Sequence, residues 1–232
     1  MKAAGAGFLL TIGFILGMAC TALAQAEQQT TVLHLSQTAE RSVLRDVLRI
    51  ELRVEETGAD PLAIQSAINR RMAAALDRAH QVQGVRVETG AYGVGEERPQ
   101  SGPSRWRGTQ SLIVTGKAAD AVLKLAGMLQ SDGLLMSSIA YELSPETLRG
   151  AEEDLTAEGL AALDRRAGSI ADRMHLALLR YRDLRVGNAE TGGRPMPRFA
   201  AAAAMAAPVA EPGEATVRVT IEAELLLAAP RP

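Results

Sequence analysis

Two stretches of the chain alternate strictly between apolar and polar residues. Residues 48–55 read Leu-Arg-Ile-Glu-Leu-Arg-Val-Glu, and residues 217–225 alternate in the same way. Successive side chains of a strand point to opposite faces, so each stretch predicts a strand with one buried face and one wet face. Shorter or weaker patterns of the same kind predict further strands at residues 31–35, 85–89, 106–115, 139–143 and 184–189.

Three other stretches repeat apolar residues every three or four positions, which is typical of helices packed along one side. The first begins at Asp60-Pro61, where Asp60 caps free amides and Pro61 needs no amide hydrogen, and it ends before Gly84. A shorter helix is expected near residues 118–131. The longest is expected after Ser144-Pro145, with an apolar line formed by Leu148, Leu155, Leu160, Leu163, Ala167, Ile170 and Met174.

The longest predicted helix carries its acidic residues early and its basic residues late, the order that the helix dipole favours. The acidic residues are Glu152, Glu153 and Asp154, and the basic ones are Arg165, Arg166 and Arg173. Three carboxylates at consecutive helix positions point about 100° apart and do not converge on one cation. This charge is therefore interpreted as a solvated helix surface.

Strands and helices alternate irregularly, with pairs of strands between helices. This order predicts an α+β protein with an antiparallel or mixed sheet and helices packed on one side. Residues 25–232 are expected to form one domain, with two subdomains divided near residue 145 as the alternative. Residues 93–108 predict an exposed hairpin loop, and the Pro- and Ala-rich residues 192–213 predict a mobile loop, with a helix at the alanines as the alternative.

The first 24 residues have the features of a cleavable signal peptide. Lys2 precedes an apolar run at residues 8–19, and Ala22-Leu23-Ala24 offers the small residues that signal peptidase accepts. The run is shorter than the about 20 residues that a spanning helix needs. The sequence therefore predicts export out of the cytoplasm and a mature chain that begins near residue 25. Cys20, the one cysteine, is removed with the signal unless it is lipidated, which is the alternative.

The order of these elements resembles the SIMPL-domain family of periplasmic proteins, the YggE-like proteins. The Ala-spaced helix and the strand after it, at residues 157–186, and the Glu-Pro-Gly-Glu at residues 211–214 before the last strand are similar to family features. Members typically carry a Gly after the first strand and a Pro-Asp pair before the second. Here Ser36-Gln37 and Arg45-Asp46 stand at those places, so only Asp46 matches.

The resemblance implies a periplasmic or outer-membrane-associated protein. Some members of the family are surface antigens, affect oxidative-stress tolerance or assemble into large channel-like oligomers. No catalytic residue or cofactor is established for the family, so the resemblance assigns none to this chain.

The residues themselves also give little support to catalysis or to a cofactor. The chain has no His-Glu-x-x-His, no Gly-x-Ser-x-Gly and no phosphate-binding Gly-x-x-x-x-Gly-Lys motif, and its histidines, His34, His80 and His175, are far apart in sequence. We therefore expect a protein that is not an enzyme and has no metal site. With 25 basic and 27 acidic residues, nothing in its charge favours nucleic acid.

The candidate for an exposed partner surface is Arg105-Trp106-Arg107, because a tryptophan between arginines is suited to anchoring a protein or an anionic lipid. The alternative is that the Trp106 ring covers the sheet or the core. Met136, Met196 and Met205 are the methionines outside predicted buried faces, where reversible oxidation would fit a stress role.

These observations lead to two hypotheses on function. The first is a non-enzymatic periplasmic protein that forms homo-oligomers, with an envelope or oxidative-stress role and possible outer-membrane association. The second is a periplasmic protein that binds a small ligand, or acts weakly as a catalyst, in a cleft between sheet and helices.

Overall fold

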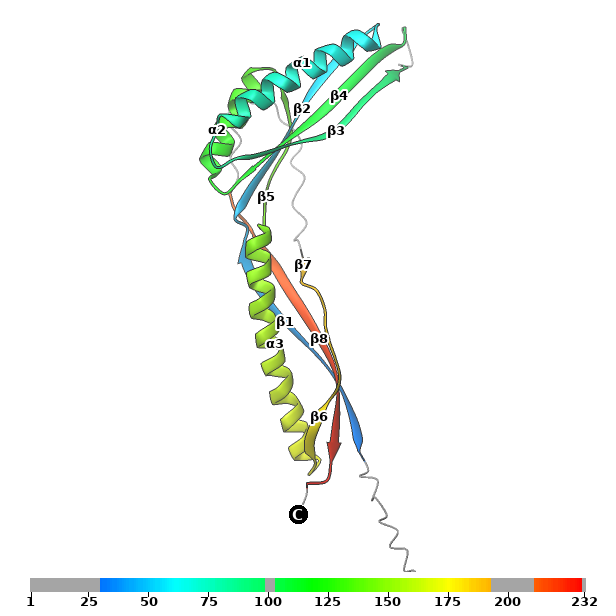
Figure 1. Ribbon diagram of the computed structural model, residues 1–232, viewed down its shortest axis with the longest axis vertical. Helices are drawn as coiled ribbons and strands as arrows, with labels where there is room; N and C mark the ends of the chain where they lie inside the picture. Colours follow the sequence, from blue (N-terminus) through cyan, green and yellow to red (C-terminus); the bar gives the residue numbers. More distant parts are fainter. Residues whose placement is uncertain (1–29, 99–102, 193–210, 231–232) are drawn as a thin grey trace, which may run out of the picture.

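The computed structural model describes residues 30–98, 103–192 and 211–230, and its elements form an elongated molecule with two sheets (Figure 1). The middle of the chain forms one sheet with two helices, which we call the middle lobe. The two ends of the chain together form the other sheet with one long helix, which we call the terminal lobe. All strand pairs are antiparallel, so the predicted α+β class is confirmed.

The middle lobe contains β2 (Val47–Gly58), β3 (Arg86–Glu97), β4 (Arg105–Gly116) and β5 (Leu135–Glu142), in the order β3-β4-β2-β5. The helices α1 (Pro61–His80) and α2 (Ala119–Ser131) cover one face of this sheet. Its core is formed by the apolar residues that alternate along β2 and by the apolar side of each helix. The largest fully buried side chains are Leu48, Ile50, Leu52, Ile68, Leu112, Leu125 and Leu129.

The predicted start of α1 is confirmed. The Asp60 carboxylate accepts a hydrogen bond from the Leu62 amide at 2.9 Å, and Pro61 occupies the first turn. After the helix the chain turns at Gly84, whose φ of 75° lies in the left-handed region that favours glycine.

The terminal lobe contains β1 (Thr31–Leu44), β6 (Ala177–Val186), β7 (Glu190–Gly192) and β8 (Glu214–Ala228). The central strand is β8, which pairs with β1 on one side and with β6 and β7 on the other. The helix α3 (Pro145–Arg173), about 43 Å long, packs along one face of this sheet (Figure 1). A second hydrophobic core lies between them, separate from that of the middle lobe.

The buried residues of α3 recur at every fourth position, and most are small: Ala151, Leu155, Gly159, Leu163, Ala167 and Ala171. A Cβ atom at Gly159 would lie 2.8 Å from Cδ1 of Ile221 on β8. The absence of a side chain there lets the helix approach the sheet. The apolar face predicted for this helix is partly wrong. Leu160 and Ile170 are only partly buried, and Met174 is 47% exposed.

The sequence also underestimated several strands. β1 continues to Leu44, although only residues 31–35 were predicted. Gln37 and Arg41 lie on the face of β1 that packs against α3. Because they are polar, the sequence does not show the alternation of apolar and polar residues expected of a strand. The predicted hairpin loop at residues 93–108 is also too long, because β3 extends to Glu97 and β4 begins at Arg105.

The chain passes between the lobes at residues 45–46 and again at residues 143–144. The predicted signal peptide at residues 1–24, with Cys20, lies outside the described residues, as does most of the predicted loop at residues 192–213, with Met196 and Met205. No helix in the described ranges is long and apolar enough to cross a membrane.

Candidate functional site

The three residues proposed as a partner surface lie on two different faces of β4. Arg105 and Arg107 point to the open face of the middle sheet, away from the helices, and both are exposed. Trp106 points to the opposite face, where its ring is partly buried against the core. This separation follows from the two-residue period of a strand. A partner that binds the open face would therefore meet the arginines without the tryptophan.

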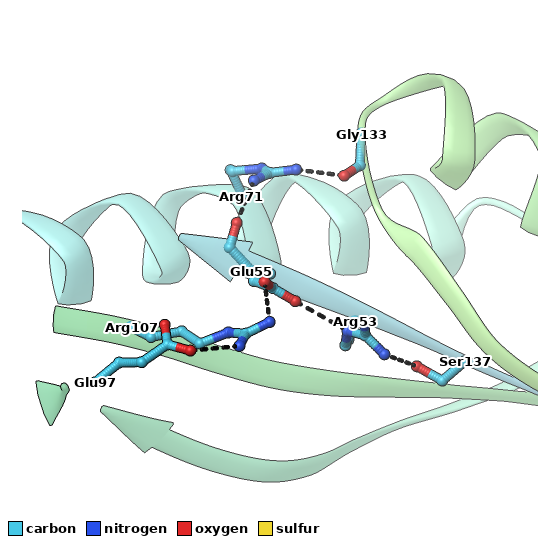
Figure 2. A network of polar contacts seen from close by, with 7 residues as sticks. All are labelled: Arg53, Glu55, Arg71, Glu97, Arg107, Gly133 and Ser137. Atoms are coloured by element: carbon cyan, nitrogen blue, oxygen red, sulfur yellow. Dashed lines mark hydrogen bonds and ion pairs between the residues drawn. The ribbon is translucent and has the colours of Figure 1, made fainter. Parts of the chain in front are cut away.

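Arg107 belongs to a polar network on this open face (Figure 2). Its guanidinium donates to the Glu55 carboxylate at 2.5 Å and lies 3.4 Å from that of Glu97. Arg53 donates to the same Glu55 carboxylate at 3.2 Å and to the Ser137 hydroxyl at 3.3 Å. The hydrogen bond from Arg107 is the largest influence on Glu55 and lowers the pKa of its carboxyl group below the usual value.

The network extends to α1 through Arg71. This guanidinium donates to the backbone carbonyl of Glu55 at 3.3 Å and to the carbonyl of Gly133 at 2.5 Å (Figure 2). It also donates to the carboxylate of Glu56 at 2.5 Å. Arg71 thereby ties α1 to the end of β2 and to the turn after α2. The arginines and glutamates of the network balance each other in charge, so the network leaves no net charge for a ligand to neutralise.

We expect the two faces of β4 to differ in what they contribute to stability. Trp106→Ala should lower the free energy of unfolding by about 2 kcal/mol, because it removes a ring packed partly on the core. Arg107→Ala should lower it by less than about 1 kcal/mol, because exposed ion pairs contribute little. Urea unfolding followed by circular dichroism measures both without relying on Trp106, the chain's one tryptophan. Equal losses in the two variants would contradict this division.

The junction between the lobes is organised around Asp46, which follows β1. Its carboxylate accepts hydrogen bonds from the Ser144 amide at 2.7 Å, the Ser144 hydroxyl at 2.8 Å and the Thr147 hydroxyl at 2.8 Å. Lys117 Nζ, just after β4, lies 3.1 Å from the same carboxylate. Ser144 is the buried polar residue of the described chain and caps the first turn of α3. One carboxylate thus joins the loops after β1, β4 and β5 to the start of α3.

Backbone bonds reinforce this junction from two sides. The Arg45 amide donates to the Gly213 carbonyl at 3.0 Å and so continues the pairing of β1 with β8. The next amide, that of Asp46, donates to the Glu142 carbonyl at 3.1 Å and begins the pairing of β2 with β5. Consecutive residues are therefore bonded to different sheets. The resemblance had shown Asp46 as a matching residue, but its role needed the three-dimensional contacts.

The described histidines do not form a cluster of ligands. His34 lies on β1 with Nδ1 3.4 Å from the Glu224 carboxylate, His80 is the last residue of α1, and His175 lies in the turn after α3. Within residues 30–98, 103–192 and 211–230, no three His, Cys, Asp or Glu side chains are placed to hold a metal ion.

Among the surface hollows of the described chain, two lie against the strands and have volumes in the range of small-ligand sites. One, of about 460 Å³, lies at the junction and is lined by Arg45, Tyr141, Leu143 and Leu148, among others. The other, of about 320 Å³, lies on the open face of the terminal sheet, where Glu222, Glu224 and Asp183 outnumber Arg185. Both are open to solvent.

The outer edge of β1 is the longest regular open edge in the described chain. The register between β1 and β8 runs from Thr31 to Leu44 without a shift. In contrast, the edge strands β3, β5 and β6 all carry irregularities in their pairing. Bulges of this kind twist an edge and discourage pairing with another chain. β1 lacks that protection.

The backbone groups of β1 divide into two rows. The bond from the Arg45 amide to Gly213 shows that odd-numbered residues point toward β8. The Arg166 guanidinium, reaching over from α3, donates to the Ser36 carbonyl at 3.1 Å, which shows that even-numbered residues point outward. Every second residue from Val32 to Leu44 therefore directs its amide and carbonyl to the open edge. No described strand pairs with them.

The comparison with protein families gives one match. The family model for SIMPL, described as a protein of unknown function (DUF541), matches residues 33–225, which run from β1 into β8 and include both lobes. The chain therefore belongs to the SIMPL family. The search of curated proteins found no match.

Proposed function

We propose that this SIMPL-family protein is exported to the periplasm and acts there by assembling with copies of itself, without catalysing a reaction. The observation that carries the proposal is the open edge of β1, a regular row of backbone donors and acceptors that a second chain can extend. Surfaces that are complementary to themselves usually join identical chains into closed, symmetric oligomers. Export rests on the apolar segment at residues 8–19 and the small residues before Gln25.

The mass of residues 25–232 in solution tests the assembly. We expect light scattering behind a sizing column to give a discrete particle of at least two subunits, whose mass stays constant over a range of concentrations. Measurements at low and high salt separate backbone pairing from attraction between surface charges, because salt screens only the latter. A chain that stays monomeric at high concentration would remove the basis of this proposal.

The physiological role that we propose is support of the envelope under oxidative or envelope stress. It rests on the family membership and on the expectation of export. Cells that lack the gene should survive peroxide less well, and the wild-type chain should restore their survival. A chain whose signal at residues 8–19 is disabled by charged substitutions should not restore it. Equal rescue by both would argue against a role in the envelope.

The second candidate function, binding of a small ligand, is favoured by the hollow at the junction. Arg45 and Tyr141 supply polar groups there, and Leu143 and Leu148 supply apolar surface. A screen of periplasmic metabolites and metals by thermal shift distinguishes the two functions, because a ligand that binds only the folded state raises the melting temperature. A shift that survives chelator and salt controls and is lost in Arg45→Ala would favour ligand binding.

A further inference from the structure

We propose that two copies of the chain pair through β1 in antiparallel fashion about a two-fold axis at Thr38, with their α3 helices side by side. This inference rests on the proposed function and specifies the contact by which assembly begins. It joins the two three-stranded paths β1-β8-β6 into one continuous sheet. The observations that support it are the direction of the backbone groups, the order of side chains along β1 and the charges of α3.

The backbone geometry permits this pairing without rearrangement of the fold. A two-fold axis perpendicular to the sheet places residues of the same parity opposite each other, because their side chains must lie on the same face. With the axis at Thr38, even-numbered residues meet even-numbered residues. These are the residues whose amides and carbonyls point outward. Ser36 would then bond with Glu40 of the second copy, and Thr38 with its own equivalent.

The side chains of β1 favour this register over its neighbours. Val32 and Leu44, which are 37% and 56% exposed, lie at opposite ends of the strand and would meet each other. On the other face, Leu33 would meet Val43. No two like charges would lie directly opposite. If the axis were shifted to Gln37, Leu44 would lose its apolar partner, and a shift to Glu40 would place two glutamates opposite each other.

The charges of α3 select a second copy as the partner. Asp154 and Glu158 lie beside Arg41 of β1, with the Asp154 carboxylate 2.9 Å from its guanidinium, and Arg166 lies beside Ser36. The helix therefore presents acidic groups along β1 on one side of Thr38, beside Arg41, and a basic group on the other side, beside Ser36. Because Ser36 comes opposite Glu40 across the axis, each Arg166 would lie beside the second copy's Asp154 and Glu158.

The spacing is also suitable for helix packing. α3 packs to a similar extent on β1 and β8, so its axis lies roughly between these strands. Neighbouring strands are about 4.8 Å apart, so the two helices would lie two strand spacings, or about 10 Å, from each other. This is within the usual distance of packed helices. Pairing would give the Ser36 carbonyl a backbone donor, and Arg166 would then be free to reach the opposite carboxylates.

A cysteine at Thr38 tests the register. Residues 25–232 contain every described element and no cysteine, because Cys20 lies before them. Backbone-bonded opposite residues have Cα atoms about 5.5 Å apart, a distance that a disulfide spans. Thr38→Cys should give a covalent dimer under mild oxidation. Thr220→Cys is the matched control, because Thr220 lies opposite Thr38 on the same face but on the central strand β8.

Two single charge reversals test the helix contact. In a homodimer, Glu158→Arg places a second basic group opposite Arg166 and leaves Asp154 as the one carboxylate of α3 at the contact. Arg166→Glu places only acidic side chains of α3 opposite each other. Each variant alone should dimerise about tenfold more weakly than the wild type. An equal mixture of the two should recover the lost affinity, because in the mixed dimer both symmetry-related contacts again join opposite charges. Analytical ultracentrifugation measures each dissociation constant, and circular dichroism confirms that each variant is folded.

The outcomes separate this inference from the proposed function. Efficient cross-linking at Thr38 but not at Thr220, together with recovery in the mixture, supports the pairing. If the wild-type chain assembles but Thr38→Cys cross-links no better than Thr220→Cys, the proposed pairing is wrong. The proposed assembly would still hold in that case. Failure of the mixture to recover overturns the helix contact. A wild-type monomer overturns the inference together with the proposed function.

Discussion

Replacing Asp46 with alanine is expected to lower the free energy of unfolding by about 3 kcal/mol, a large effect for a side chain outside the core. The substitution removes the acceptor of three hydrogen bonds from Ser144 and Thr147 and the partner of Lys117. It leaves the Ser144 amide and hydroxyl with fewer partners in a buried position. Urea unfolding measures the loss, and hydrogen exchange should show faster opening at the first turn of α3.

A matched control is the other aspartate that caps a helix. Asp60 accepts one hydrogen bond from the Leu62 amide in an exposed position, and asparagine caps a helix about as well as aspartate does. Asp60→Asn should therefore change the stability by less than about 0.5 kcal/mol. Asp46→Asn should cost much more, because an amide cannot accept from all the donors around it. Similar losses in both variants would show that the junction has no special role.

The effect of Asp46 should depend on pH. Burial alone raises the pKa of its carboxyl group, but the hydrogen bonds from Ser144 and Thr147 and the contact with Lys117 outweigh it and hold this pKa well below its usual range. The unfolded chain, with an ordinary aspartate pKa of about 3.9, takes up the proton first as the pH falls. The stabilisation is therefore complete at neutral pH and is lost in acid. The stability difference between wild type and Asp46→Asn should narrow from pH 6 to pH 3, and a constant difference would contradict this cause.

Replacing Gly159 with leucine is expected to destabilise the terminal lobe by about 2 kcal/mol. A Cβ atom at this position would lie 2.8 Å from Cδ1 of Ile221 and 3.6 Å from Cβ of Ala39. The whole leucine side chain would push α3 away from β8 and β1. This loss exceeds the gain of under about 1 kcal/mol that leucine brings over glycine as a helix former.

Gly168, on the same helix, provides the control for this prediction. A Cβ atom there has no neighbour within 4 Å, so Gly168→Leu should keep the gain in helix propensity without a clash. Thermal and urea unfolding of the two variants should therefore shift in opposite directions. If Gly159→Leu were as stable as Gly168→Leu, the close approach of α3 to the sheet would not be needed for the fold.

The sequence predicted best those elements in which local pattern and tertiary environment agree. β2 and β8 alternate strictly because one face of each is fully buried, and the starts of α1 and α3 carry capping residues followed by proline. The second half of β1 was missed because Arg41 on its helix-facing row is held by carboxylates of α3, more than 100 residues later in the chain. Local pattern does not contain such a contact.

The residues of the candidate site were likewise not predictable from local sequence pattern. The sequence groups residues 105–107 as one candidate surface, whereas the strand places Trp106 on one face and the arginines on the other. The Asp46 junction joins residues about 100 positions apart, and its geometry exists only once both lobes are in place. The open edge of β1 likewise became visible only when the irregular pairing of the other edges was known.

The central position of β8 has a consequence for how the chain folds as it is made or exported from its amino-terminal end. The middle lobe is contiguous in sequence and can fold once β5 has emerged. β1 and β6 must instead wait for β8, the last of the described strands, before either has its main partner. Until then β1 is open on both edges, which is when a chain is most prone to aggregate. A truncation before Glu214 would therefore spare the middle lobe and leave the terminal lobe without its organising strand.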